Sequence, residues 1–284
     1  MEHLLEILLH VLPEALPMLP FLFGAYLLME YMEHKAPARL KNLLVGHSGS
    51  GSVIGALLGC LPQCGFSVAA ANLYAGGVIT AGSLLAVFLS TSDEALFVLL
   101  GHPDRWTEIA RLLGCKVVLA VVVGLLVDYI GRKKYGKHHH EHIHDLCGEC
   151  GCGQHHGGIL RPALWHTLHV FAFIFVVMFL MELGVHALGE ERLAAILLSD
   201  SPLQPVLAAL VGFVPNCAVS VVLTELYLSG GISFGSALAG LSTGAGVGLL
   251  VLWRTHKDAK TNLKLMAILF AAASLSGILL QLVM

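Results

Sequence analysis

Six apolar runs constrain the fold more than any other feature of this chain, because each has about the length of a helix that crosses the hydrocarbon core of a membrane. The composition agrees, since 56% of the 284 residues are hydrophobic and only 12% are charged. We therefore predict an all-α, polytopic integral membrane protein in a lipid bilayer. The runs cover residues 11–33, 81–100, 109–130, 164–188, 233–253 and 263–283.

Two further apolar regions, 42–76 and 203–229, are each interrupted by a Pro-x-Cys sequence and repeat one another. Residues 59–86 and 212–239 are identical at 13 of 28 aligned positions, where chance gives roughly two or three. The match between Leu28-Met29-Glu30 and Leu180-Met181-Glu182 extends the repeat back to the first apolar run. The chain is thus an internal duplication. The expected units are a first repeat at 1–131, a loop at 132–161 and a second repeat at 162–284.

Loop charges predict that the two repeats have opposite orientations, because Lys and Arg in short loops favour the cytoplasm. Loop 34–41 is basic and its counterpart 189–202 is acidic, whereas loop 101–108 is mixed and its counterpart 254–262 is basic. These signs place both termini outside and the central loop in the cytoplasm. Inverted-topology repeats with broken helices are the plan of secondary transporters, whose substrate lies near the midplane between the breaks.

The two Pro-x-Cys breaks are the first candidate site. Pro62 and Pro215 remove backbone donors, and non-helical backbone at membrane depth lies inside protein or along a wet cavity. Cys64 and Cys217 follow two residues later and offer thiolates to soft metal ions. A simple packing kink would also use such small residues. The next polar side chains on the half-helices, also candidates for ion binding, are Ser67, Asn72, Ser220 and Glu225.

The second candidate site is the segment Ser90-Thr91-Ser92-Asp93-Glu94 within the run 81–100. Adjacent carboxylates inside an apolar run are costly and mark a functional site, as ligands of a divalent cation or as a proton-carrying pair. After a one-residue slip, Ser242-Thr243 match Ser90-Thr91, but Gly244-Ala245-Gly246 replace the acids. A single cation site with acidic ligands from only one repeat would require this difference between the repeats. The alternative is a pair of acids that face water at the end of a span.

Two Glu/His pairs lie near the ends of predicted spans. Their members are four residues apart and so share a helix face, which suits a proton or metal relay. Polar side chains near span ends also reach water easily, and both interpretations stay open. The pairs are Glu30 with His34 and Glu182 with His186.

The central loop carries a run of imidazoles and thiols, the ligands of zinc, nickel and copper, and is a predicted metal-binding tract. Within it, His140-Glu141-x-x-His144 matches the signature of zinc proteases, but we do not favour a membrane metalloprotease because no helix supports the motif. The metal-binding candidates are His138, His139, His140, His142, His144, Cys147, Cys150, Cys152, His155 and His156.

The paired Gly-x-x-Pro-x-Cys-x-x-Ser-Val breaks, the Ser-Thr-Ser-Asp-Glu-Ala segment, the Leu-Tyr-x-x-Gly motifs and the His/Cys-rich loop together resemble the ten-span heavy-metal exporters. These bacterial proteins are described as arsenic efflux or manganese transporters and look distantly similar to the ArsP-type permeases. The resemblance implies about 10 membrane segments and efflux of a metal or metalloid across the bacterial inner membrane.

We therefore predict a transporter, not an enzyme, that exports a manganese-like divalent cation with a proton as the coupling ion. Efflux of arsenite or an organoarsenical through the thiols is the alternative. No resident cofactor is expected, since the metal is the cargo, and no basic tract indicates nucleic acid. A homodimer stays open.

Overall fold

The computed structural model describes residues 11–13, 15–16, 18–34, 48–61, 65–91, 106–135, 160–188, 203–215 and 217–283. Over these residues the protein is all-α, as predicted, and contains no strand. Apolar runs form these helices because a helix satisfies its own backbone hydrogen bonds where water is absent. They are α2 (Met18–His34), α4 (Ser48–Gly59), α5 (Gly65–Ala75), α6 (Ala81–Ser90), α8 (Trp106–Tyr135), α9 (Leu160–Leu188), α11 (Gln204–Val211), α12 (Cys217–Leu228), α13 (Phe234–Thr243), α14 (Val247–Thr255) and α15 (Ala259–Val283).

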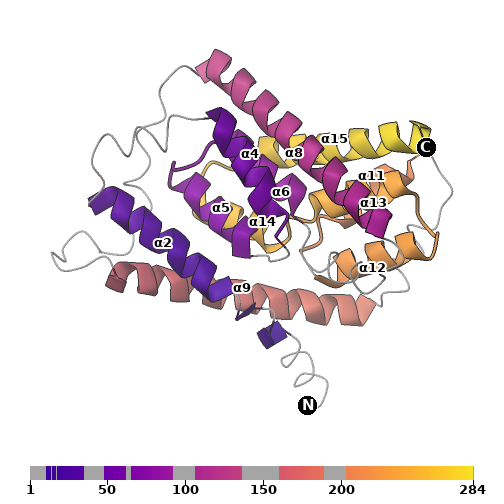
Figure 1. Ribbon diagram of the computed structural model, residues 1–284. Helices are drawn as coiled ribbons and strands as arrows, with labels where there is room; N and C mark the ends of the chain where they lie inside the picture. Colours follow the sequence, from indigo (N-terminus) through magenta and orange to yellow (C-terminus); the bar gives the residue numbers. More distant parts are fainter. Residues whose placement is uncertain are drawn as a thin grey trace.

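The duplication seen in the sequence is a duplication of helices. At an offset of 153 residues, α6 and α13 have the same bounds, while α4, α5 and α8 correspond to α11, α12 and α15. In both repeats the short helix, α6 or α13, packs between the helix before the break and the long helix after it. The helices α2 and α9 pack against each other along one side of these two units (Figure 1).

The repeated sequence motifs correspond to repeated local structures. Leu-Tyr-x-x-Gly ends α5 and α12, where Gly77 and Gly230 have φ values of 70° and 78°. The carbonyl groups of Leu73 and Leu226 accept the closing hydrogen bonds five residues on, which is the geometry of a Schellman cap. The short helices then begin with side-chain caps. The hydroxyl oxygen of Thr80 accepts from the Ser83 N–H in α6, and that of Ser233 accepts from the Ser236 N–H in α13.

Glycines allow the short helix to touch the long one in each repeat. Gly82 of α6 lies against the backbone of Gly124 in α8, and Gly235 of α13 lies against Gly277 in α15. A Cβ atom built on any of these four glycines would be closer to its neighbour than van der Waals contact allows. Small residues at such crossings bring helix backbones together in membranes.

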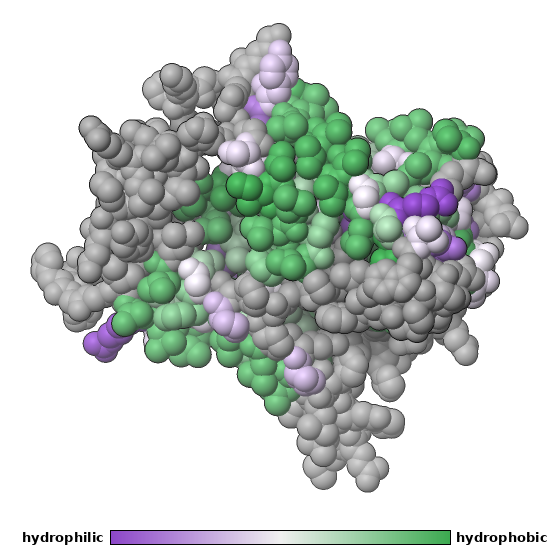
Figure 2. Space-filling view, viewed as in Figure 1, coloured by the Kyte–Doolittle hydropathy of each residue, from purple (hydrophilic) through white to green (hydrophobic). Residues whose placement is uncertain are grey.

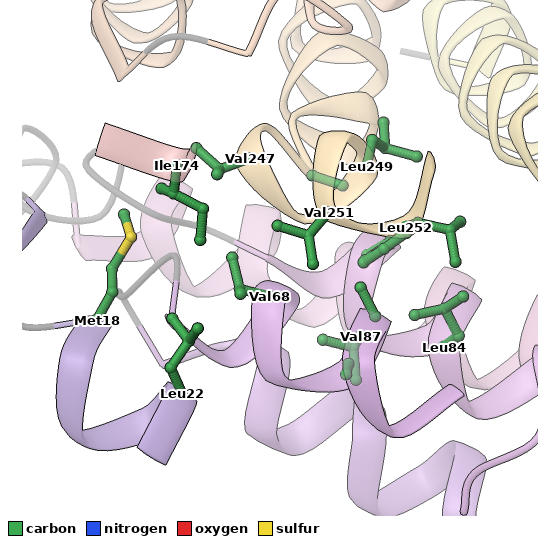
Figure 3. Close-up of a cluster of buried hydrophobic side chains, with 14 of the residues drawn as sticks. Met18, Leu22, Val68, Leu84, Val87, Ile174, Val247, Leu249, Val251 and Leu252 are labelled. Carbon is green, nitrogen blue, oxygen red and sulfur yellow. The ribbon is translucent and has the colours of Figure 1, made fainter. Parts of the chain in front are cut away.

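The helix α14 belongs to the second repeat but packs within the first. Its side chains Val247, Val251 and Leu252 join Val68 of α5 and Leu84 of α6 in one apolar cluster (Figure 3). This helix of the second repeat is therefore packed against helices of the first, and the two repeats interlock.

Four described helical stretches are long and apolar enough to span a membrane: Thr107–Gly131, Ala163–Leu180, Phe234–Thr255 and Ala259–Val283. The apolar side chains Ile54, Val118 and Val122 are more than half exposed. Figure 2 shows hydrophobic residues gathered over the area that α4 and α8 occupy in Figure 1. A surface of this kind suits contact with lipid chains.

The span expected at 233–253 is present as the stretch Phe234–Thr255, but it is interrupted. Helix α13 ends at Thr243 and α14 begins at Val247. Between them Gly246 has φ 48° and ψ −123°, a conformation open mainly to glycine. In the first repeat α6 ends at Ser90 with Thr91 as its C-cap, and residues 92–100 lie outside the described part of the chain.

Candidate substrate site at the helix breaks

Each repeat is interrupted at the predicted Pro-x-Cys break. Helix α4 ends at Gly59 before α5 begins at Gly65, and α11 ends at Val211 before α12 begins at Cys217. Pro215 lies in the second of these interruptions, outside any helix. Pro62 and Cys64 lie outside the described residues, as does the side chain of Cys217.

The C-terminal ends of α6 and α13 meet at Lys116 of α8. This lysine is 1% exposed. Its ammonium Nζ donates hydrogen bonds to the carbonyl oxygen of Thr91 and, over 2.9 Å, to that of Leu241. Sequence reasoning missed this residue, although a lysine inside the apolar run 109–130 was a visible signal, because a charge at membrane depth is a functional candidate by default.

The position of Lys116 along α8 places this meeting point near mid-depth. Lys116 is nine residues beyond Thr107, where the apolar part of α8 begins, a rise of roughly 14 Å. The ten residues of α6 and the ten of α13 span about 15 Å each, half of a hydrocarbon core of about 30 Å. Each short helix is therefore a half-helix, about half as long as the hydrocarbon core is thick.

The two half-helices approach Lys116 from opposite ends of α8. Helix α6 starts beside Asp128, whose carboxylate accepts a hydrogen bond from the backbone N–H of Gly82 over 2.9 Å. Helix α13 starts beside Arg111, whose guanidinium lies 5.6 Å from the ring centre of Phe234. Asp128 and Arg111 are separated by about 26 Å along the helix. The long helices α8 and α15 also run in opposite directions across Figure 1.

The serines that follow the Pro-x-Cys breaks both lie near the break between α13 and α14. A Cβ atom on Gly248 of α14 would lie 2.9 Å from the Ser67 hydroxyl oxygen, and one on Gly244 would lie 3.7 Å from that of Ser220. Ser67 is buried and Ser220 is half-buried. Two predicted site residues, one from each repeat, are thus placed next to the glycine-rich break between α13 and α14.

The other predicted hydroxyls at the helix ends bond mainly to backbone carbonyls. Ser90 donates to Ala86 and Val87, and Thr91 also donates to Val87. Thr243 donates to Ala209 over 2.7 Å. The Ser242 hydroxyl, fully buried, has no hydrogen-bond partner within the described part of the chain.

The structure also corrects our alignment of these hydroxyls. Gly59 of α4 lies against the Ser90 hydroxyl, and Gly212, its counterpart, lies against that of Thr243. Ser90 therefore corresponds to Thr243 without the one-residue slip that we assumed, and Thr91 corresponds to Gly244. The one-residue slip paired two Ser-Thr dipeptides, but the helix packing keeps the constant offset of 153 residues between the repeats.

Asn72 and Glu225 occupy equivalent positions but different environments. Asn72 is buried, and its oxygen accepts a hydrogen bond from the Tyr26 hydroxyl over 3.0 Å while its nitrogen donates to Val68. Glu225 is exposed on α12. The Asn72 side chain thus connects α5 to α2.

Asp128 is a second buried charge that sequence reasoning missed. It accepts hydrogen bonds from the hydroxyls of Ser52 and Thr80, at 3.1 and 2.8 Å, and from the Gly82 N–H. The carboxylate therefore caps the N-terminal end of α6, where negative charge is favoured. At the start of α13, the side-chain oxygen of Gln204 accepts hydrogen bonds from the Ser233 N–H and the Ser236 hydroxyl.

Several predicted site residues lie outside what the structure describes. These are Asp93, Glu94 and the loop residues 138–156 entirely, and the side chains of Glu30, His34, Glu182 and His186. Among the described residues there is no group of three or more His, Cys, Asp or Glu side chains that could hold a metal ion.

The fold and the site define a class. A duplicated membrane protein whose half-helices end at mid-depth has the plan of a secondary transporter. A family model described as "Putative, 10TM heavy-metal exporter" matches residues 19–189 and 167–284, and the chain belongs to this family. The predicted resemblance and the prediction of a multi-span membrane protein of about 10 segments are thereby confirmed. No curated protein and no solved structure matches the chain.

Proposed function

We propose that this protein exports a manganese-like divalent cation across the bacterial inner membrane in exchange for protons. The observation that carries the proposal is the meeting of α6 and α13 at Lys116, since substrates of secondary transporters bind where discontinuous helices end near the midplane. Family membership supports metal export in general. The choice of a divalent cation rests on the sequence, because Asp93 and Glu94 offer the oxygen ligands that such ions prefer.

Inverted repeats are part of this proposal. The opposite approach of α6 and α13 to Lys116 supports them, because related helices that enter from opposite sides are what an inverted duplication produces. The loop charges supply the orientation, with the basic central loop in the cytoplasm. In that location its imidazoles and thiols would capture metal ions before export.

The test is metal flux into liposomes that contain the purified protein, with manganese, zinc, nickel, cobalt and arsenite offered separately. We expect manganese flux that falls roughly tenfold or more in Asp93→Asn and Glu94→Gln, since each 1.4 kcal/mol of lost binding is a factor of ten. Asp258→Asn, which changes an acid outside the spans, is the matched control. Arsenite flux that depends on Cys64 and Cys217 but not on the acids would establish the alternative substrate.

Proton coupling is tested in the same liposomes. An imposed pH gradient should drive manganese against its own gradient, and an ionophore that abolishes the pH difference should stop this. Manganese accumulation that ignores the pH gradient would contradict the exchange of protons.

Deletion of residues 138–156 separates transport from proteolysis. A transporter should keep a residual metal flux without this loop, whereas a metalloprotease built on His140 and His144 would lose all activity. The deletion should also remove most of the zinc that the full chain binds in equilibrium dialysis.

A further inference from the structure

Lys116 is a charged side chain in the apolar interior. It is 1% exposed on a helix whose neighbouring outward residues are apolar. An ammonium group at this depth is costly unless it is hydrogen-bonded. The carbonyl oxygens of Thr91 and Leu241 accept from its Nζ, so backbone groups stand where water would otherwise surround the charge.

Both acceptors belong to the C-terminal ends of helices. Thr91 is the C-cap of α6, and Leu241 lies in the last turn of α13. The carbonyl groups of a last turn have no partner further along the helix and carry partial negative charge. Because α6 and α13 arrive from opposite ends of α8, two negative helix ends point at one position.

The two repeats do not contribute equally to this position. At the offset of 153 residues Lys116 corresponds to Leu269 of α15, which is fully buried and apolar. Its neighbours follow the repeat closely, since Leu112 and Ala120 correspond to Leu265 and Ala273. The duplication therefore supplies two helix ends, whereas only one repeat supplies an ammonium group.

We propose that the carbonyl oxygens of Thr91 and Leu241 form a cation-binding position, and that the Lys116 ammonium is its built-in occupant, which an exported cation displaces. Carbonyl oxygens of unwound helix ends are ligands for cations inside membranes. The ligand class is a primary ammonium or a metal cation that has shed part of its water. Displacement rests on the proposed export function, whereas the binding position does not.

The binding position is tested by replacing the ammonium with one from solution. Lys116→Ala leaves space for n-propylammonium, and Lys116→Met keeps the apolar stem but leaves space for NH₄⁺. The measured quantity is the unfolding temperature in detergent as a function of the concentration of each chloride salt. Tetramethylammonium chloride, which has no N–H donors, and n-propanol, which has no charge, are the control probes. Leu269→Ala and Leu269→Met are the matched controls.

We expect the unfolding temperature to rise saturably by about 3 °C when Lys116→Ala binds n-propylammonium and when Lys116→Met binds NH₄⁺. This is the rise for a ligand present at about ten times its dissociation constant. The unfolding temperatures of wild type and of both Leu269 variants should not respond, because the Lys116 ammonium still occupies the position between the two carbonyl oxygens. No rise in either Lys116 variant, or an equal rise in the controls or with n-propanol, would overturn the proposal. The two variants are independent, so one that does not fold leaves the other to decide.

Displacement is tested with Mn²⁺ flux into liposomes. Lys116→Met should show a severalfold lower half-saturating Mn²⁺ concentration than wild type, because the metal no longer competes with a tethered ammonium. An unchanged or higher value would overturn displacement. Absence of Mn²⁺ flux in wild type would instead count against the export function and leave the thermal result standing.

Discussion

The contact between Gly277 of α15 and α13 gives the sharpest prediction about stability. A Cβ atom on Gly277 would lie 2.6 Å from the carbonyl oxygen of Gly235 and 2.8 Å from each Cβ of Ala239 and Pro205. Carbon atoms in contact prefer about 3.5–4.0 Å, so Gly277→Ala requires α15 to move away by nearly 1 Å. The neighbours are backbone and short side chains that cannot rotate away.

The expected magnitude is the difference between two effects. Overpacking a tight contact costs about 1–3 kcal/mol, while alanine gains up to about 1 kcal/mol over glycine within a helix. We expect a net loss of about 1–2 kcal/mol, or roughly 2–8 °C in unfolding temperature. Tryptophan fluorescence during heating in detergent measures it.

Two further glycines serve as comparisons. Gly124→Ala in the first repeat should also destabilise, since its Cβ would lie 2.8 Å from the Gly82 carbonyl oxygen. Gly114→Ala in the same helix should not, because nothing lies within 4 Å of its Cβ, and alanine there should raise the unfolding temperature slightly. If Gly277→Ala were as stable as Gly114→Ala, the close approach of α13 and α15 would be refuted.

Three other predictions concern single residues. Asp128→Asn should lower the free energy of unfolding by about 1–2 kcal/mol, because the charged cap of α6 loses acceptor strength, and heating in detergent checks this against wild type. Gly246→Ala should cost about 1–2 kcal/mol, because φ is 48° there, and metal flux in liposomes should fall as the break is disturbed. The hydrogen bond from Thr261 holds the pKa of Asp258 below its usual value, so this cap of α15 stabilises above the unfolded-state pKa and is lost as pH falls through the folded-state pKa. On acidification, the unfolding temperature of wild type should therefore fall further than that of Asp258→Ala. Equal decreases would show that Asp258 does not stabilise α15 as a cap.

The sequence was informative where a motif produces a local structure. Apolar length predicted α8, α9 and α15, and the repeat predicted interruptions at the two Pro-x-Cys sequences. Proline announces a break because it cannot donate the hydrogen bond that a helix needs. The Leu-Tyr-x-x-Gly motif proved to be a helix cap.

The break after α13 could not be seen in the same way. Its residues Gly244-Ala245-Gly246 contain no charge and no proline, and glycine is common in membrane helices. The role of Lys116 could not be predicted for another reason. It depends on the ends of two helices that are far away in sequence. Only the packing of the two repeats brings these ends to one lysine.

Charge is distributed unequally between the repeats at three equivalent positions. Lys116 corresponds to Leu269, Asp128 to Gln281 and Glu225 to Asn72. In a two-fold duplicated transporter with equal halves, the inward-open and outward-open forms would have nearly equal energy. A single ammonium held between α6 and α13 removes this equality, because the ammonium is anchored in one repeat while its acceptors lie in both. In the proposed export cycle, it would therefore bias which form is populated when no cargo is bound. It cannot drive net export, since a fixed charge returns to the same state in every cycle, so the direction must come from an ion gradient such as the proposed proton gradient.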